Sequence, residues 1–128
     1  MRILLDTQAF LWLSIDSPLL SKKAKKLFLD EHNDCYLSLA SIWEMAIKVS
    51  IGKLKLKQNV EKFVLNQIQE NGIQQLDIDF RHVVKVASLP FHHRDPFDRL
   101  IISQAIEEKM SVLSIDAAFD SYPVKRLW

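Results

Sequence analysis

The chain has 128 residues, of which 48% are hydrophobic and only two are glycine, and its formal net charge is +1. This length predicts a single domain over residues 1–128, and the composition excludes a disordered chain. No apolar run approaches the roughly 18 residues of a membrane span. One cysteine, Cys35, leaves no partner for an intrachain disulfide and no cysteine-based zinc site, which favours a reducing, cytoplasmic location.

Predicted strands and helices alternate along the first half of the chain. Residues 2–6 (RILLD) are a short apolar run ending on an acid, as expected of a buried strand. Residues 7–14 predict one helix and residues 17–32 a second. Residues 34–39 predict another strand, which leads into a helix of good helix formers over residues 40–52.

Residues 53–57 (KLKLK) alternate in polarity and predict a short extended piece. A helix over residues 59–72 follows, with Gly72 as its C-cap. Residues 73–78 predict the third strand. Residues 79–90 then predict a segment capped by Asp79, whose inward positions are Phe80, Val83, Val84 and Ala87.

The last third contains a predicted helix from about residue 96 to 109, a fourth strand over 111–116 and a possible fifth over 124–128. This alternation predicts an α/β fold with a central, mostly parallel sheet of four to five strands flanked by helices. Ligands of such sheets bind outside the carboxyl ends of the strands, so the residues that follow strands are the functional candidates.

Four acids occupy such positions: two follow strands directly and two lie near the starts of helices, and they are Asp6, Glu44, Asp98 and Asp116. Each also has a purely structural interpretation. Asp6 and Asp116 could be N-caps, Ser41 and Glu44 fit a capping box, and Asp98 is favoured by the helix dipole. Four carboxylates at one sheet edge would repel one another, however, and oxygen ligands suit Mg²⁺ or Mn²⁺. The set therefore predicts a divalent metal site and phosphoryl chemistry on a polyanion.

Other carboxylate-dependent classes fit the sequence less well. Gln8 stands where a haloacid-dehalogenase-like phosphatase needs a second acid, and a receiver domain needs an acidic pair that the first strand lacks. No P-loop, dinucleotide-binding glycine motif or nucleophile elbow is present. Two lysine groups, residues 22–26 and 48–57, are either solvated faces or a surface that meets phosphates.

Four stretches together resemble the PIN domain, and most closely the VapC-like ribonuclease toxins of type II toxin–antitoxin pairs. They are LLDTQAFLWL, SLASIWEMAIKVSIGKL, HHRDPFDRLIISQA and VLSIDAAFDSYPVKRLW, which occur in the family's order over almost the whole chain. The resemblance implies a PIN-like fold and an endoribonuclease that uses one or two Mg²⁺ or Mn²⁺ ions and leaves 5′-phosphate and 3′-hydroxyl ends. It implies that the catalytic and metal-binding acids are Asp6, Glu44, Asp98 and Asp116.

The resemblance also implies roles for neighbouring residues. Thr7 would support the first acid, and Arg99 would orient a carboxylate, contact phosphate or form a structural ion pair. Asp98 takes the catalytic place, whereas Asp95 and Pro96 are expected at the N-cap and first position of the helix.

Several other polar and aromatic residues have both a structural and a functional interpretation. His92 and His93 are expected to have a loop role, with RNA contact as the alternative, and Asp120 is expected at the surface. Trp12, Trp43 and Phe97 could stack on bases but more often such residues fill a core or an interface.

The implied partners are an RNA substrate, a cognate antitoxin and a second copy in a homodimer. Apolar side chains of the early helices are candidates for the antitoxin groove or for the core, namely Leu11, Trp12, Leu19 and Leu20. Two other functions remain open at this point: a PIN-like RNA-processing nuclease without an antitoxin, and an interaction module with weak catalysis.

Overall fold

The computed structural model describes residues 1–128 and is built on a five-stranded sheet in which all neighbouring strands run parallel, in the order β3-β2-β1-β4-β5. The strands are β1 (Arg2–Leu5), β2 (Asp34–Ser38), β3 (Gln74–Leu76), β4 (Ser111–Leu113) and β5 (Arg126–Leu127). The predicted α/β fold with a parallel sheet is confirmed. Because β1 lies between β2 and β4, the carboxyl ends of these three strands meet at one edge.

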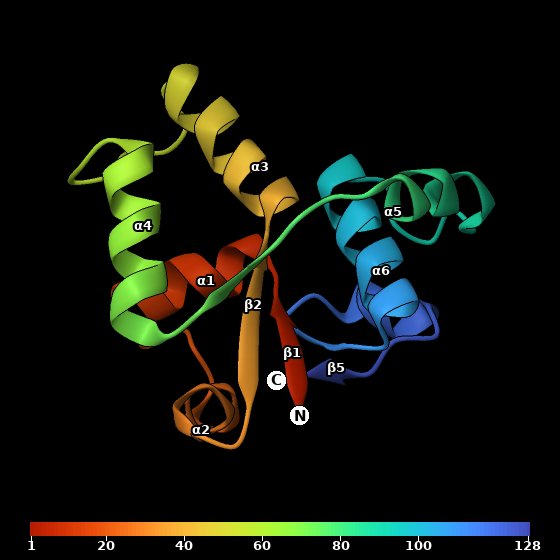
Figure 1. Cartoon of the computed structure of the whole chain (residues 1–128), viewed down its shortest axis with the longest axis horizontal. Coiled ribbons are helices and arrows are strands. Elements are labelled where there is room, and N and C mark those ends of the chain that lie inside the picture. Colours follow the sequence, from red (N-terminus) through yellow and green to blue (C-terminus); the bar gives the residue numbers. More distant parts are fainter.

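Six helices and two short 3-10 helices cover the sheet. They are α1 (Thr7–Ser14), α2 (Lys22–Leu29), α3 (Leu39–Ser50), α4 (Val60–Asn71), α5 (Phe80–Lys85), η1 (Val86–Ser88), α6 (Pro96–Glu108) and η2 (Ala117–Ser121). Figure 1 shows α1 and α4 on one side of the strands, α5 and α6 on the other, and α3 beyond the end of β2. None of the helices is long and apolar enough to cross a membrane.

The core is divided by the sheet into two layers, and the alternation of β1 explains why. Ile3 and Leu5 pack into one apolar cluster with residues of α1, α2 and α4, while Leu4 packs into the other with residues of α6. Successive side chains of a strand point to opposite faces, so an uninterrupted apolar run is required where both faces are covered. The short RILL segment thus anchors both layers and fixes the edge at which Asp6 emerges.

Two predicted elements have different bounds in the structure. The second helix begins at Lys22, because the Ser21 hydroxyl accepts a hydrogen bond from Ala24 N at 3.0 Å and caps it there. Residues 53–57 form no strand. The backbone N–H groups of Lys53 and Leu54 instead donate to Lys48 O and close the turn after α3.

The predicted inward face of α5 is wrong. Phe80 is 81% exposed, Val83 54% and Val84 50%, and Ala87 in η1 is also exposed, whereas His82 is buried. Helix α5 has only six residues, so its orientation is set by polar contacts at its start rather than by an apolar stripe. Asp79 and His82 form a reciprocal capping box: the Asp79 carboxylate accepts from His82 N, and Asp79 N donates to His82 Nδ1 at 3.1 Å.

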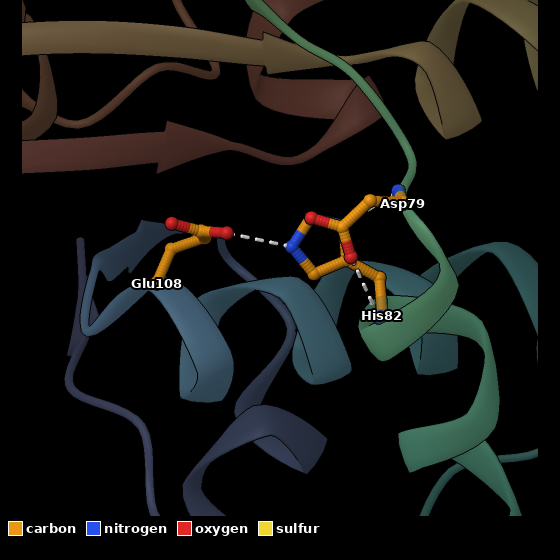
Figure 2. A group of neighbouring side chains, drawn as sticks. All are labelled: Asp79, His82 and Glu108. Carbon is orange, nitrogen blue, oxygen red and sulfur yellow. Dashed lines mark hydrogen bonds and ion pairs between the residues drawn. The ribbon is translucent and has the colours of Figure 1, made fainter.

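His82 also fastens α5 to α6, as Figure 2 shows for its contact with Glu108. Its Nε2 lies 2.8 Å from Glu108 Oε1, and the Ser103 hydroxyl donates to its backbone oxygen at 2.5 Å. Arg81 places its guanidinium 3.1 Å from Glu108 and 3.3 Å from Asp79. The guanidinium therefore already supplies a cation to this group of Asp79, His82 and Glu108, and the group joins two helices.

Replacing His82 with alanine is expected to lower the free energy of unfolding by about 2–3 kcal/mol, because it removes two hydrogen bonds from a buried side chain and leaves a cavity. Urea unfolding followed by circular dichroism would measure the change. The matched control is His32→Ala, since that side chain is 94% exposed and should change stability by less than about 0.5 kcal/mol. Equal effects of the two substitutions would contradict the fastening role of His82.

Candidate functional site

Three of the four candidate acids follow the three central strands. Asp6 directly follows β1, Asp116 lies three residues after β4, and Glu44 lies in the second turn of α3, which follows β2 without a break. Asp98, the fourth, is the third residue of α6. The four acids are close enough to repel one another. The charges of Asp116 and Glu44 raise the pKa of Asp6, and those of Asp6 and Glu44 raise the pKa of Asp98. The structure therefore brings all four predicted acids to the carboxyl edge of the sheet.

Asp6 is almost fully buried and also caps α1. Its Oδ1 accepts a hydrogen bond from Ala9 N at 2.7 Å. Burial is the main cause that raises the pKa of Asp6 to about 6, and the charges of Asp116 and Glu44 add to it. The Asp6 side chain thus has both a structural contact and an electrostatic environment that favours a nearby cation.

Glu44 is buried between two polar partners rather than used in a capping box. The true N-cap of α3 is Ser38, whose hydroxyl accepts from Ala40 N, so Ser41 lies inside the helix. The Thr7 hydroxyl donates to Glu44 Oε1 at 2.6 Å and lies 2.9 Å from Ser41 Oγ. Thr7 therefore contacts the second acid, not the first, to which the resemblance assigned it.

Asp98 is freed for another role because Asp95 caps α6. Asp95 Oδ1 accepts from the backbone N–H of Phe97 at 2.8 Å and of Asp98 at 3.1 Å, with Pro96 at the first helical position. Burial, followed by the charges of Asp95 and Asp6, raises the pKa of Asp98 to about 7. The prediction that Asp95 is the N-cap of this helix, with Pro96 at its first position, is confirmed. The catalytic role of Asp98 stays a prediction.

Asp116 has the opposite pKa shift. Burial alone would raise the pKa of this carboxyl, but hydrogen bonds from Ala118 N and His93, together with the charge of Arg126, hold it below its usual value. Its Oδ1 accepts from Ala118 N at 2.9 Å and caps η2. Asp120 lies at the surface as predicted and pairs with Arg126 at 3.0 Å.

Two basic residues beside the acids were not assigned to the site by sequence reasoning. Lys48 Nζ lies 2.8 Å from Glu44 Oε2, and this hydrogen bond is the main cause that raises the pKa of Lys48. The spacing of four residues from Glu44 on one helix could have indicated this pair. His93 Nε2 lies between Asp98 and Asp116, and nothing local in the sequence signals it, because its loop is held by Tyr122, about thirty residues further on.

Arg99 points away from the acids. It is buried, and its guanidinium donates to the backbone oxygens of Val86, Leu89 and Pro90 at 3.0–3.1 Å. The Phe91 ring covers it, with 4.1 Å between the guanidinium carbon and the ring centroid. Arg99 therefore fixes the loop that precedes α6.

The aromatic candidates lie in two places. Trp43 is more than half exposed and meets Phe97 edge to face, at 5.1 Å between centroids, next in sequence to Glu44 and Asp98. Trp12 packs against Trp128 at 5.8 Å, away from these acids. The pair of Trp43 and Phe97 connects α3 to α6, the two helices that carry Glu44 and Asp98.

The donor set suits a hard divalent cation. Oxygen ligands from Asp6, Glu44, Asp98 and Asp116 are the type that Mg²⁺ and Mn²⁺ prefer. Side-chain atoms of His93, Asp98 and Asp116 that could ligate an ion lie within 4.8 Å of one another. Burial is the main cause of the raised pKa values of Asp6 and Asp98, and the neighbouring carboxylates add a repulsion that a divalent cation would relieve.

A parallel α/β sheet with four acids at its carboxyl edge defines an α/β protein with a carboxylate site, and comparison with known families identifies which family it is. The sequence matches the PIN domain over residues 3–125, so the chain belongs to the PIN-domain family. No curated protein matches the sequence significantly.

Three solved structures have the same fold. The chain is similar to a chain of the VapBC2 complex from Rickettsia felis, which was solved bound to a DNA fragment from the VapBC2 promoter. The sequence identity is 17%, the TM-score is 0.73 and 100% of each chain is covered. FitAcB from Neisseria gonorrhoeae matches at 21% identity and TM-score 0.65, over 97% of this chain and 95% of that one. A toxin–antitoxin complex from Klebsiella pneumoniae matches at 14% identity and TM-score 0.59, over 94% of this chain and 92% of that one. At these identities the likeness establishes the fold.

The raised pKa values predict that, without divalent metal, the protein becomes less stable as pH rises. Asp6 and Asp98 bind protons up to pH 6–7 in the folded state but only up to their ordinary 3.8 when unfolded. Their contribution to stability is therefore complete below about pH 4 and is lost as pH rises through 6 to 7. Each pKa unit of difference corresponds to about 1.4 kcal/mol.

Urea unfolding in EDTA between pH 5 and 8 would measure this decline. The variant Asp98→Asn should make the decline shallower and leave only the part due to Asp6, which ends near pH 6. Asp120→Asn, which changes a surface acid, should leave the slope as in the unmodified protein. A free energy of unfolding that stays constant or rises over this range would contradict the assignment.

Proposed function

We propose that this PIN-domain protein is a metal-dependent endoribonuclease and the toxin of a type II toxin–antitoxin pair. The observation that carries the proposal is the convergence of Asp6, Glu44, Asp98 and Asp116 at one sheet edge, two of them with pKa values raised by burial and mutual repulsion. The same acids could each cap a helix, but Glu44 and Asp98 cap nothing. Their position is therefore better explained by a cation than by local structure.

The four carboxylates would hold one or two Mg²⁺ or Mn²⁺ ions. When bound, such an ion polarises a phosphate and makes a coordinated water more acidic. The chain's own groups prepare the site: the Thr7 hydroxyl fixes one oxygen of Glu44, and Ala9 N fixes one oxygen of Asp6. Lys48 adds a half-exposed ammonium group beside Glu44, where it can meet the backbone of a polyanion.

A groove beside α1 supports a peptide partner. It has a volume of about 740 Å³ and is lined by both apolar and polar side chains, including Leu11 and Trp12 of α1, Leu54 and Leu56 of the loop between α3 and α4, and Phe63 of α4. Of the four residues expected in an antitoxin groove, Leu11 and Trp12 line it, Leu20 is in the core and Leu19 is exposed. We assign the groove to an apolar segment of the cognate antitoxin. The structural neighbours that are toxin–antitoxin complexes support this choice.

The α5 surface, formed by Phe80, Val83 and Val84, supports a second assembly. These three exposed apolar side chains lie on the face that sequence periodicity assigned to the core. Exposed apolar patches of this kind mark interaction sites. We assign the α5 surface to a second copy of the chain. The cytoplasm is the expected location, given a single, buried cysteine.

A cleavage assay with purified protein tests the nuclease. Structured RNA at neutral pH should be cut with Mg²⁺ or Mn²⁺ but not with EDTA. Asp98→Asn should reduce cleavage to the EDTA background, because it removes one ligand charge without removing the cap that Asp95 supplies. Asp6→Asn should do the same, and asparagine still caps α1.

The control for this assay is Asp120→Asn, which changes a surface acid and should keep full activity. Cleavage that survives in Asp98→Asn would indicate a contaminating nuclease and reject the site. An unmodified protein that binds metal and RNA but cuts nothing would favour the interaction module instead.

Light scattering tests both assemblies. The free chain should be a dimer that Val84→Glu converts to a monomer.

Coexpression with the product of a short reading frame next to the gene should give a stable complex, which Leu56→Asp weakens about tenfold or more. Leu65→Asp is the matched control, because Leu65 is an exposed leucine of α4 outside the groove. A monomeric free chain, or a complex insensitive to Leu56→Asp, would overturn the corresponding assignment.

A further inference from the structure

His93 lies at the centre of the acidic site although it comes from the loop before α6. Its Nε2 atom is 2.8 Å from Asp116 Oδ2 and 3.1 Å from Asp98 Oδ2. The side chain is 12% exposed, and the ring meets Phe119 edge to face at 5.9 Å. One imidazole thus joins two acids that belong to different elements, α6 and the turn after β4.

The other ring nitrogen fixes which tautomer is present. Asp95 N donates a hydrogen bond to His93 Nδ1 at 3.1 Å, so Nδ1 carries the lone pair and the proton is on Nε2. A nitrogen that carries a proton cannot ligate a metal. His93 therefore presents an N–H donor to the acids: it donates to Asp116 Oδ2 at 2.8 Å, and Asp98 Oδ2 lies 3.1 Å from the same nitrogen.

The position of the ring is set by the protein alone. The Tyr122 hydroxyl accepts from His92 N at 3.0 Å and from His93 N at 2.8 Å, and donates to Pro90 O at 2.7 Å. Arg99 donates to Pro90 O and, at 3.4 Å, to His93 O. Both Tyr122 and Arg99 are buried. The donor is thus held in place before any ion arrives, which is what pre-organisation of a site requires.

We propose that His93 is a positioning residue of the metal site, which holds Asp116 through a hydrogen bond from Nε2–H, lies beside Asp98 Oδ2 and does not itself ligate the ion. The inference rests on the proposed metal site. His93 donates to Oδ2 and Ala118 N donates to Oδ1, so both oxygens of the Asp116 carboxylate have a donor that orients them. Asp98 keeps Oδ1 for an ion, while its Oδ2 lies 3.1 Å from the same imidazole nitrogen. Groups that hydrogen-bond to ligands in this way commonly change metal affinity by about 10- to 100-fold.

Metal binding measured without RNA tests the proposal. Calorimetric titration with Mn²⁺ should show about 10- to 100-fold weaker binding for His93→Leu, which fills similar space without a donor. His93→Gln should recover much of the loss, because its amide can place an N–H near the position of Nε2. The matched control is His92→Leu, since His92 is exposed and should bind Mn²⁺ as the unmodified protein does.

Two spectroscopic measurements on the unmodified protein distinguish positioning from ligation and do not depend on a variant that folds. Nitrogen-15 spectra of the imidazole should show a bare Nδ1 and a protonated Nε2, before and after Mg²⁺ is added. Electron spin-echo spectra of bound Mn²⁺ should show no coupling to an imidazole nitrogen.

The outcomes separate this inference from the proposed function. Unchanged affinity in His93→Leu would overturn the role of His93 while leaving the metal site intact, and so would an imidazole nitrogen coupled to Mn²⁺. No binding of Mn²⁺ by the unmodified protein would overturn the metal site and the inference with it.

Discussion

Repulsion among four carboxylates is the constraint on which the rest of this structure depends. A parallel sheet with β1 between β2 and β4 places three strand ends side by side, and acids that follow those ends cannot avoid one another. Two of the four acids are withdrawn from water, since Asp6 and Glu44 are less than 10% exposed. Protonation removes part of the negative charge, since the pKa of Asp98 rises to about 7 and that of Asp6 to about 6. Binding a divalent ion at neutral pH would then release protons, which couples metal affinity to pH.

Capping and ligation are compatible interpretations of the same side chains. Asp6 and Asp116 each use one oxygen to cap a helix that begins immediately after the strand edge, and this contact sets the direction of the carboxylate. An acid that was free to rotate would lose entropy on binding a cation, whereas a capped acid has already lost it. The local rule that places aspartate at an N-cap therefore also helps to orient a site, and neither interpretation excludes the other.

Much of the fold could be predicted because its signals are local. The helix over residues 7–14 has its predicted bounds, and the helix ending near residue 72 terminates at Gly72 with a φ of 64°, a conformation that favours glycine. The positions of the four acids relative to strands required only the alternation of elements. The orientation of α5 was not predictable in this way, because six residues are too few for an apolar stripe to outweigh the contacts of His82 with Asp79 and Glu108.

The environment of the acids was predicted less well than their positions. The supposed capping box at Ser41 depended on where α3 begins, and that is decided by Ser38, three residues earlier. Thr7 contacts Glu44 across 37 positions of sequence, and His93 is placed by Tyr122 across 29. Such contacts arise only when the sheet brings distant segments together, so no periodicity or local motif in the sequence could indicate them.

The run from His93 to Arg99 shows how a short motif can hold a site together from both sides. Asp95 caps α6, and its backbone N–H donates to Nδ1 of His93. Asp98, in the first turn of the helix, lies 3.1 Å from Nε2 of the same imidazole. Arg99 points the opposite way and binds the carbonyl groups of the loop that carries His93. Asp95 and Arg99 thus stabilise the loop that carries His93, and this loop in turn places His93 beside Asp98, the residue before Arg99. A substitution of Arg99 would therefore loosen the loop that presents His93, because the carbonyl groups of this loop would lose the cation that they surround.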